Sequence, residues 1–254
     1  MAQPSPVPVR YPSGVSTDFK WGPLADFGRP NPFGYHFFQD DFDILNPTYV
    51  ATKTGAGTLT GVAGGGGFLL ATTAALATDN VVLNLPFAGF QLTQGKKAFY
   101  LTRFQLSSAS NAGFICGLIN TTTTPFTGGQ ITDGIWISKV TGSLTNLNIN
   151  YALASVVTTV ALPTGAYTLA NATNLDMGFY VDRFGNINAF IGAQLVGWLP
   201  QSGVGALFGG RGVVAAIAPA TLTAVNLNPT IGILSGTAAA STMTIDFEMA
   251  AQER

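Results

Sequence analysis

The chain has 254 residues, a formal net charge of −1 at pH 7 and 47% hydrophobic residues, but only 9% charged residues. An ordinary soluble domain has about 25% charged residues, so this chain lacks the basic surface that nucleic acids or anionic membranes attract. Acids, bases, nucleophiles and metal ligands are also scarce, which predicts a protein that is not an enzyme and has no cofactor. With so little charge to keep copies apart, the chain is suited to an assembly.

Residues 1–38 differ in composition from the rest of the chain. Seven prolines in this segment disfavour helices and central strands. Aromatic residues lie between them, at Tyr11, Phe19, Trp21, Phe27, Phe33 and Tyr35. Disordered segments are poor in aromatic residues, so we predict an extended arm whose aromatic side chains are buried on its own domain, a sister subunit or another protein. The alternative is an unstructured tail.

No leader or membrane segment is expected. The first ten residues contain no apolar run of the kind found in a signal peptide. The most apolar later stretch, residues 204–219, is interrupted by Gly209, Gly210 and Arg211 and is too short to span a bilayer. The remaining residues, 39–254, are therefore predicted to form a single globular domain.

Short alternating or apolar runs, separated by Gly, Asp and Asn, follow one another from residue 36 onward. The strands they predict are 36–42, 58–62, 68–72, 81–85, 98–106, 114–119, 134–138, 144–151, 156–162, 175–182, 186–192, 194–198 and 241–249. Residues 175–198 give the clearest pattern, a three-strand meander with a tight turn at residues 182–186. The pattern predicts an all-β protein, an antiparallel β-sandwich or jelly roll with an extended N-terminal arm.

Two of the predicted strands have a clear division into faces. In 98–106, one face is expected to present Phe99, Leu101 and Arg103, and the other Tyr100, Phe104 and Leu106. In 241–249, strict alternation predicts an inward face of Met243, Ile245, Phe247 and Met249, and an outward face of Thr242, Thr244, Asp246 and Glu248.

The residues that bear chemistry do not form a known motif. Asp40, Asp41 and Asp43 are the one acidic cluster, which is either a Ca²⁺ site or, as we prefer, a charged strand edge that blocks stray pairing. The single histidine, His36, and the single cysteine, Cys116, are interpreted as structural residues, because no serine or cysteine motif accompanies them. No catalytic or metal-binding residue is therefore assigned.

Three further groups of residues bear on function. Residues 64–67 form a glycine run that lacks the Lys-Ser/Thr of a phosphate-binding loop. Tyr100, Phe104 and Trp136 are a conceivable sugar-stacking platform, but aromatic residues on strands usually pack in the core. The carboxylates available for glycoside hydrolysis are Asp176, Asp182, Asp246 and Glu248, and no pair of them is marked by the sequence.

Two resemblances to known families rest on short motifs. The meander, with Tyr180, Asp182, Gly185, Phe190, Gly192 and Val196, is similar to the late hairpin of concanavalin A-like (laminin G-like) sandwiches. The opening Arg-Tyr-Pro-Ser-Gly-Val at residues 10–15 and the run Tyr-His-Phe-Phe-Gln-Asp-Asp-Phe-Asp at residues 35–43 resemble capsid decoration (cement) proteins of tailed bacteriophages. The runs at residues 95–104, 132–136 and 179–182 also look like that family.

The second resemblance implies a structural protein of the virion. It implies a jelly-roll domain, usually trimeric, that is made in the bacterial host cytoplasm, binds the major capsid protein on the outer surface of the head and clamps neighbouring capsomers. The expected contact residues are the arm aromatics, Tyr11, Phe19, Trp21, Phe27, Phe33 and Tyr35. Two alternatives remain, a carbohydrate-binding module of a tail fibre or spike and a glycan-cleaving enzyme, and the scarcity of acids argues against the enzyme.

Overall fold

Fifteen β-strands make up the described part of the computed structural model. Residues 35–44, 48–62, 67–86, 89–93, 95–122, 124–126, 130–162, 168–191, 194–199 and 225–254 are described, with the backbone alone for 194–199. The strands are β1 (Tyr35–Asp40), β2 (Val50–Thr54), β3 (Thr58–Val62), β4 (Phe68–Thr72), β5 (Asn80–Asn84), β6 (Ala98–Leu106), β7 (Ala112–Ile119), β8 (Gly134–Lys139), β9 (Leu147–Leu153), β10 (Val156–Ala161), β11 (Leu175–Val181), β12 (Ile187–Ile191), β13 (Gln194–Leu199), β14 (Asn228–Ser235) and β15 (Thr242–Glu253). In this part of the chain no helix is long and apolar enough to cross a membrane.

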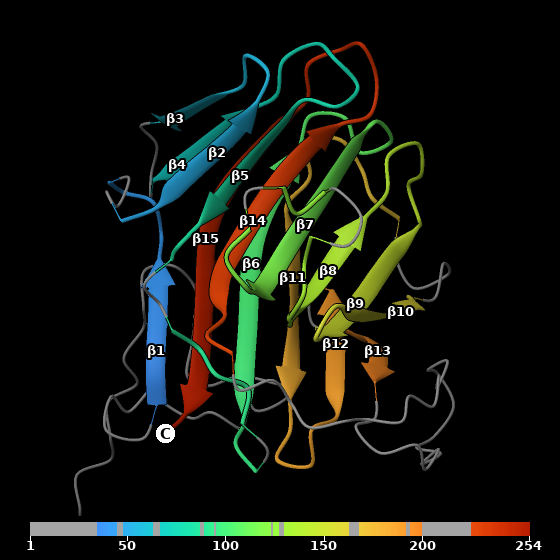
Figure 1. The fold of residues 1–254 in the computed structure, drawn as a ribbon. Coiled ribbons are helices and arrows are strands. Elements are labelled where there is room, and N and C mark those ends of the chain that lie inside the picture. The colour runs from blue at the N-terminus through green and yellow to red at the C-terminus, as the bar shows by residue number, and fades with distance from the viewer. Residues whose placement is uncertain are drawn as a thin grey trace, which may run out of the picture.

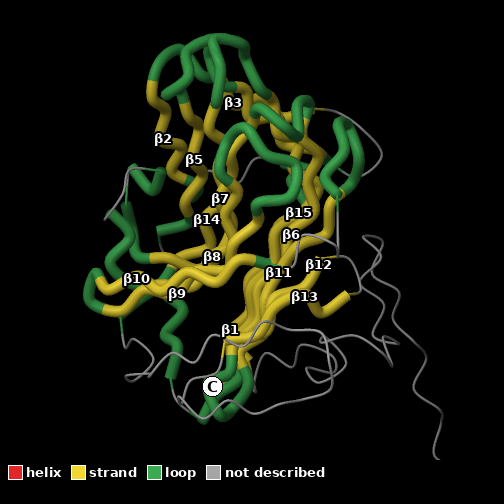
Figure 2. Tube along the Cα trace, turned by 90° about the vertical axis from the view of Figure 1, so that its right-hand side faces the viewer, coloured by secondary structure: helices red, strands yellow, loops and turns green. Residues whose placement is uncertain are grey.

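The strands form two antiparallel sheets that pack face to face as a β-sandwich (Figure 1). One sheet has the order β13-β12-β11-β6-β15-β4-β3, with β1 added beside the C-terminal half of β15, and the other has the order β10-β9-β8-β7-β14-β5-β2. Figure 2 shows the two layers from the side. This arrangement confirms the predicted all-β sandwich, and the predicted meander is present as β11, β12 and β13.

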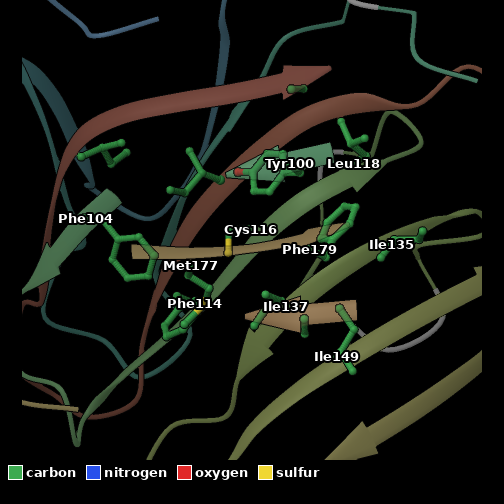
Figure 3. Packing of buried hydrophobic residues seen from close by; sticks show 14 of the residues in the cluster. Tyr100, Phe104, Phe114, Cys116, Leu118, Ile135, Ile137, Ile149, Met177 and Phe179 are labelled. Atoms are coloured by element: carbon green, nitrogen blue, oxygen red, sulfur yellow. The ribbon is translucent and has the colours of Figure 1, made fainter. Parts of the chain in front are cut away.

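The core lies between the two sheets and is built from the inward-facing side chains of both. Tyr100 stacks on Phe179 with ring centroids 5.5 Å apart, and Phe104 of β6 meets Phe114 of β7 edge-on at 5.0 Å. Cys116 lies among these residues and is fully buried (Figure 3), so its interpretation as a small core residue is confirmed. Burial raises the pKa of its thiol well above the ordinary value.

Two strands of the structure were not predicted. β14 is a central strand between β7 and β5, although its sequence contains Pro229 and Gly232, which normally interrupt central strands. Pro229 is the second residue of the strand, where its carbonyl still accepts a hydrogen bond from the N–H of Leu85 at 3.1 Å. β2 is short and exposed, so it has no apolar face that alternation would reveal.

The prediction for the last strand is half wrong. Met243 and Ile245 face the core as expected, but Phe247 and Met249 lie on the outer face and Glu248 faces inward. The cause is a β-bulge, because Ile245 pairs with Phe104 and Phe247 pairs with the adjacent Arg103, which leaves Asp246 as an extra residue. One inserted residue exchanges the two faces of every residue after it.

Candidate functional site

The outer face of the sheet that contains β6, β11 and β15 is divided into two halves. We call the first the apolar half, formed by Phe99, Leu101, Phe190, Phe247, Met249 and Ala251. The second is the polar half, formed by Arg103, Gln105, Asn174, Asp176 and Asp246. The predicted faces of 98–106 are confirmed, since Tyr100, Phe104 and Leu106 belong to the core.

Arg103 is the centre of the polar half. Its Nε and Nη2 donate to the two carboxylate oxygens of Asp176 at 2.5 and 3.1 Å, and its Nη1 lies 3.5 Å from Asp246 Oδ2. The guanidinium also lies 5.4 Å from the ring centroid of Phe247. A two-pronged pair between arginine and a carboxylate holds both groups in a defined plane, so the cluster presents charged groups in a fixed arrangement.

Backbone register explains why these three residues meet. Arg103 and Asp176 are direct cross-strand partners on β6 and β11. Asp246 is the extra residue of the bulge in β15, which turns its side chain to the outer face beside Arg103. Partial burial raises the pKa of Asp246, and the nearby Arg103 cation opposes that rise. About a third of each side chain remains exposed, so the cluster is accessible to a polar ligand.

The same bulge places a carboxylate inside the sandwich. Glu248 is fully buried and accepts hydrogen bonds from the hydroxyls of Tyr49, at 3.0 Å, and Tyr100, at 2.7 Å. Asp40 is its cross-strand partner on β1. Burial raises the pKa of Glu248 to about 7, against the hydrogen bonds of the two tyrosines, and the Asp40 charge adds to the rise.

Two carboxylates of the predicted acidic cluster accept hydrogen bonds from backbone N–H groups. Asp40 Oδ1 accepts from the N–H of Phe42 at 2.8 Å, and Asp43 Oδ1 accepts from the N–H of Gly67 at 2.7 Å, while Asp41 is exposed. Over the described ranges, no three His, Cys, Asp or Glu side chains come together as a metal site. Asp40 and Asp43 therefore stabilise the turn after β1 and its contact with Gly67, the residue before β4.

The other sequence candidates lie apart from one another. His36 packs against Phe90 with ring centroids 4.7 Å apart. Tyr100 and Phe104 are core residues, while Trp136 is buried on the outside of the opposite sheet, so the three do not form a platform. Asp182 holds the turn after β11 by accepting from the N–H groups of Phe184 and Asn186.

The predicted arm lies almost entirely outside the described residues. Tyr11, Phe19, Trp21, Phe27 and Phe33 are among residues 1–34, which are not described, and so is most of the glycine run 64–67. Tyr35 is described, and it is the first residue of β1, where its half-buried side chain packs on the apolar half. β1 therefore extends across the predicted boundary between arm and sandwich at residue 38.

Comparison with known proteins identifies the fold. No family model and no curated protein matches the chain. An endo-1,3-beta-glucanase from Streptomyces sioyaensis matches with a TM-score of 0.57, 13% identity and coverage of 87% of this chain and 98% of that one. Peanut lectin matches at 0.54, with 10% identity and coverage of 86% and 97%. The fold is a concanavalin A-like jelly roll.

A structure of phage origin shares this fold. The CBM2 module of the evolved Dit protein from Lactobacillus casei BL23 phage J-1 matches with a TM-score of 0.50, 9% identity and coverage of 86% of this chain and 96% of that one. At these identities the comparisons establish architecture, since one sandwich fold supports many functions.

The prediction that the chain is not an enzyme is corrected by these comparisons. A glucanase shares the fold over nearly its whole length, so the sandwich is a scaffold on which catalysis occurs. The prediction was wrong because it relied on overall composition, whereas glycoside hydrolysis needs only two well-placed carboxyl groups. Asp176 and Asp246, which are 70 residues apart in sequence, show that scarce carboxylates do converge on Arg103.

Proposed function

We propose that this protein is a structural component of a phage virion that binds the outside of the head and clamps neighbouring capsomers. The observation that carries the proposal is a pair of sheet edges with little charge, which lie at one end of the sandwich as its described strands form it. β2 and β3 each end a sheet, with Val50 and Val62 50% and 40% exposed, and Lys53 is the one charged residue between positions 50 and 62. Edge strands of free proteins usually carry charges or prolines that block pairing, so such edges suit an assembly.

The capsid as partner follows from the resemblance of the arm and first strand to cement proteins. In this proposal the arm aromatics Tyr11, Phe19 and Trp21 are the anchors on the major capsid protein, because buried aromatic residues dominate interface energies. Several weak contacts that engage together hold the subunit firmly. The subunit binds the closed shell and not the opened one, so its binding stabilises the closed shell against the pressure of packed DNA.

Co-sedimentation with phage heads stripped of their decoration tests this function. We expect saturable binding of the full chain, and loss of binding when Tyr11, Phe19 and Trp21 are replaced together by Ser. A matched control is the triple replacement of exposed Ile44, Leu76 and Phe184 by Ser, which should bind like the wild type. The proposal is overturned when the wild type does not bind heads, or when the arm variant binds at full strength.

A second candidate is favoured by the polar half of the outer face. Arg103, Asp176 and Asp246 present a cation and two carboxylates, and Gln105 donates to Asn174 beside them at 2.6 Å. Such groups both donate to and accept from the hydroxyls of a sugar, and the phage structure that shares the fold is a CBM2 module. The candidate function is a carbohydrate-binding module of a tail fibre or spike.

Glycan-array binding distinguishes the second candidate. We expect a specific glycan signal that is lost in Arg103→Ala, because removal of the guanidinium releases both carboxylates from their fixed positions. Arg183→Ala is the matched control, since Arg183 pairs with Glu253 away from the polar half. Equal signals from the two variants, or no signal from the wild type, would contradict glycan binding at this face.

A further inference from the structure

Basic side chains gather at one end of the sandwich. Four of the seven lysines and arginines in the described part of the chain lie there, and we call them the basic rim: Lys96, Lys97, Arg183 and Arg254. Two acidic residues, Asp182 and Glu253, accompany these four cations. The rest of the described chain has three lysines and arginines against eight Asp and Glu residues. The described chain therefore has one basic end and an acidic remainder.

Strand pairing places the four cations at neighbouring strand ends. Lys97 precedes β6, and its carbonyl accepts from the N–H of Glu253, the last residue of β15, at 2.8 Å. The carbonyl of Arg183, just after β11, accepts from the N–H of Gly95 at 3.2 Å. The strands β15, β6 and β11 are consecutive in their sheet, so these ends lie within about 10 Å of one another. Figure 1 shows them at the lower end of the sandwich, beside the C-terminus.

The two carboxylates of the rim are already engaged. Glu253 accepts from Arg183 Nη2 at 2.5 Å and from Arg183 Nε at 3.2 Å, and this pairing lowers the pKa of Glu253. Asp182 accepts from backbone N–H groups of its own turn. Neither Lys96 nor Arg254 forms an ion pair with a carboxylate side chain of the described residues. The charges of these two residues are therefore left for a partner.

We propose that the basic rim binds an acidic protein surface, through ion pairs between its lysines and arginines and the carboxylates of the partner. An acidic surface attracts this end of the molecule and repels the acidic remainder, so the rim also fixes the orientation of the subunit. β1 begins at the same end, since Tyr35 pairs with Glu253. The rim thus lies where the chain enters the sandwich. That the acidic surface belongs to the capsid rests on the proposed function.

The number of cations favours a protein over a nucleic acid. Proteins that hold DNA through about 6–10 phosphate contacts depend on a broad basic surface. The rim has four cations on three adjacent strand ends, and Arg183 already pairs with Glu253. Such a small group suits a few carboxylates at fixed positions, where ion pairs set specificity and the rate of association.

Retention of the isolated full chain on immobilised poly-L-glutamate tests the rim. We expect the wild type to be retained at low salt, and Lys96→Glu to bind about tenfold more weakly. Both should be released in about 1 M salt, where the Debye length is about 3 Å. The matched control is Ala75→Glu with Ala77→Glu, which changes the net charge by the same amount in the exposed β4–β5 loop at the other end of the sandwich. The control should be retained like the wild type.

The outcomes separate the rim from the capsid. The proposal is overturned when the wild type is not retained, when Lys96→Glu is retained as well as the control, or when immobilised single-stranded DNA binds the wild type more tightly than poly-L-glutamate does. Should Lys96→Glu unfold, the pair Lys96→Gln and Arg254→Gln replaces it. On stripped heads, we expect Lys96→Glu to bind more weakly than the control. A wild type that binds poly-L-glutamate through the rim but does not bind heads contradicts the proposed function alone.

Discussion

The free energy of unfolding is expected to fall by about 3 kcal/mol as the pH rises from 5 to 8, because Glu248 must then ionise inside the core. Its pKa is about 7 in the folded protein and 4.5 in an unperturbed chain. Between these values the folded state holds a proton that the unfolded state has lost, so stability declines as the pH rises. Each unit of pKa difference corresponds to about 1.4 kcal/mol.

One substitution removes the ionisable group of Glu248 and keeps its hydrogen bonds. In Glu248→Gln the amide oxygen accepts from one tyrosine hydroxyl and the amide nitrogen donates to the other, so Tyr49 and Tyr100 both keep a partner. We expect this variant to match the wild type near pH 5 and to be about 3 kcal/mol more stable at pH 8. Asp40, the cross-strand partner of Glu248 on β1, loses one nearby like charge in this variant.

Urea unfolding at intervals of half a pH unit measures this difference. Glu253→Gln is the control, because Glu253 is on the same strand but pairs with Arg183 at the surface, which lowers its pKa. That variant should keep the decline between pH 5 and 8. A Glu248→Gln protein whose stability declines as steeply as that of the wild type would show that Glu248 is not the titrating group.

Sequence reasoning succeeded where side-chain alternation is regular. The strands at residues 98–106 and the three-strand meander at residues 175–198 were predictable, and so were the two faces of 98–106. It failed for β14, because Pro229 and Gly232 are local signals against a strand, whereas the strand exists through its pairing with β7 and β5. Tertiary pairing outweighs local preference at such positions.

The candidate site was not predictable, for a different reason. Strand register and a β-bulge bring together Arg103, Asp176 and Asp246. Local composition predicts neither the register nor the bulge. Asp176 and Asp246 were among the carboxylates that the sequence offers for glycoside hydrolysis, but nothing in the sequence pairs them with each other or with Arg103. A bulge leaves no mark in the sequence of β15, which alternates through it.

Deletion of Asp246 is expected to be tolerated, because it removes the extra residue and leaves every other side chain on its present face. Ile245 and Phe247 already pair with consecutive residues of β6, so the deletion closes the bulge into a regular ladder. Arg103 keeps its two bonds to Asp176. We expect a loss of no more than about 2 kcal/mol, within the ordinary range of single changes.

Deletion of Thr244, two residues earlier, is the matched comparison. The strand must then turn either Met243 or Ile245 out of the core, and removal of such a buried side chain costs about 2–5 kcal/mol. Urea unfolding followed by tryptophan fluorescence compares the two deletions with the wild type. Equal destabilisation would mean that the bulge is itself required by the fold. A smaller loss for the Asp246 deletion would show that the bulge serves the outer face, where it supplies the second carboxylate beside Arg103.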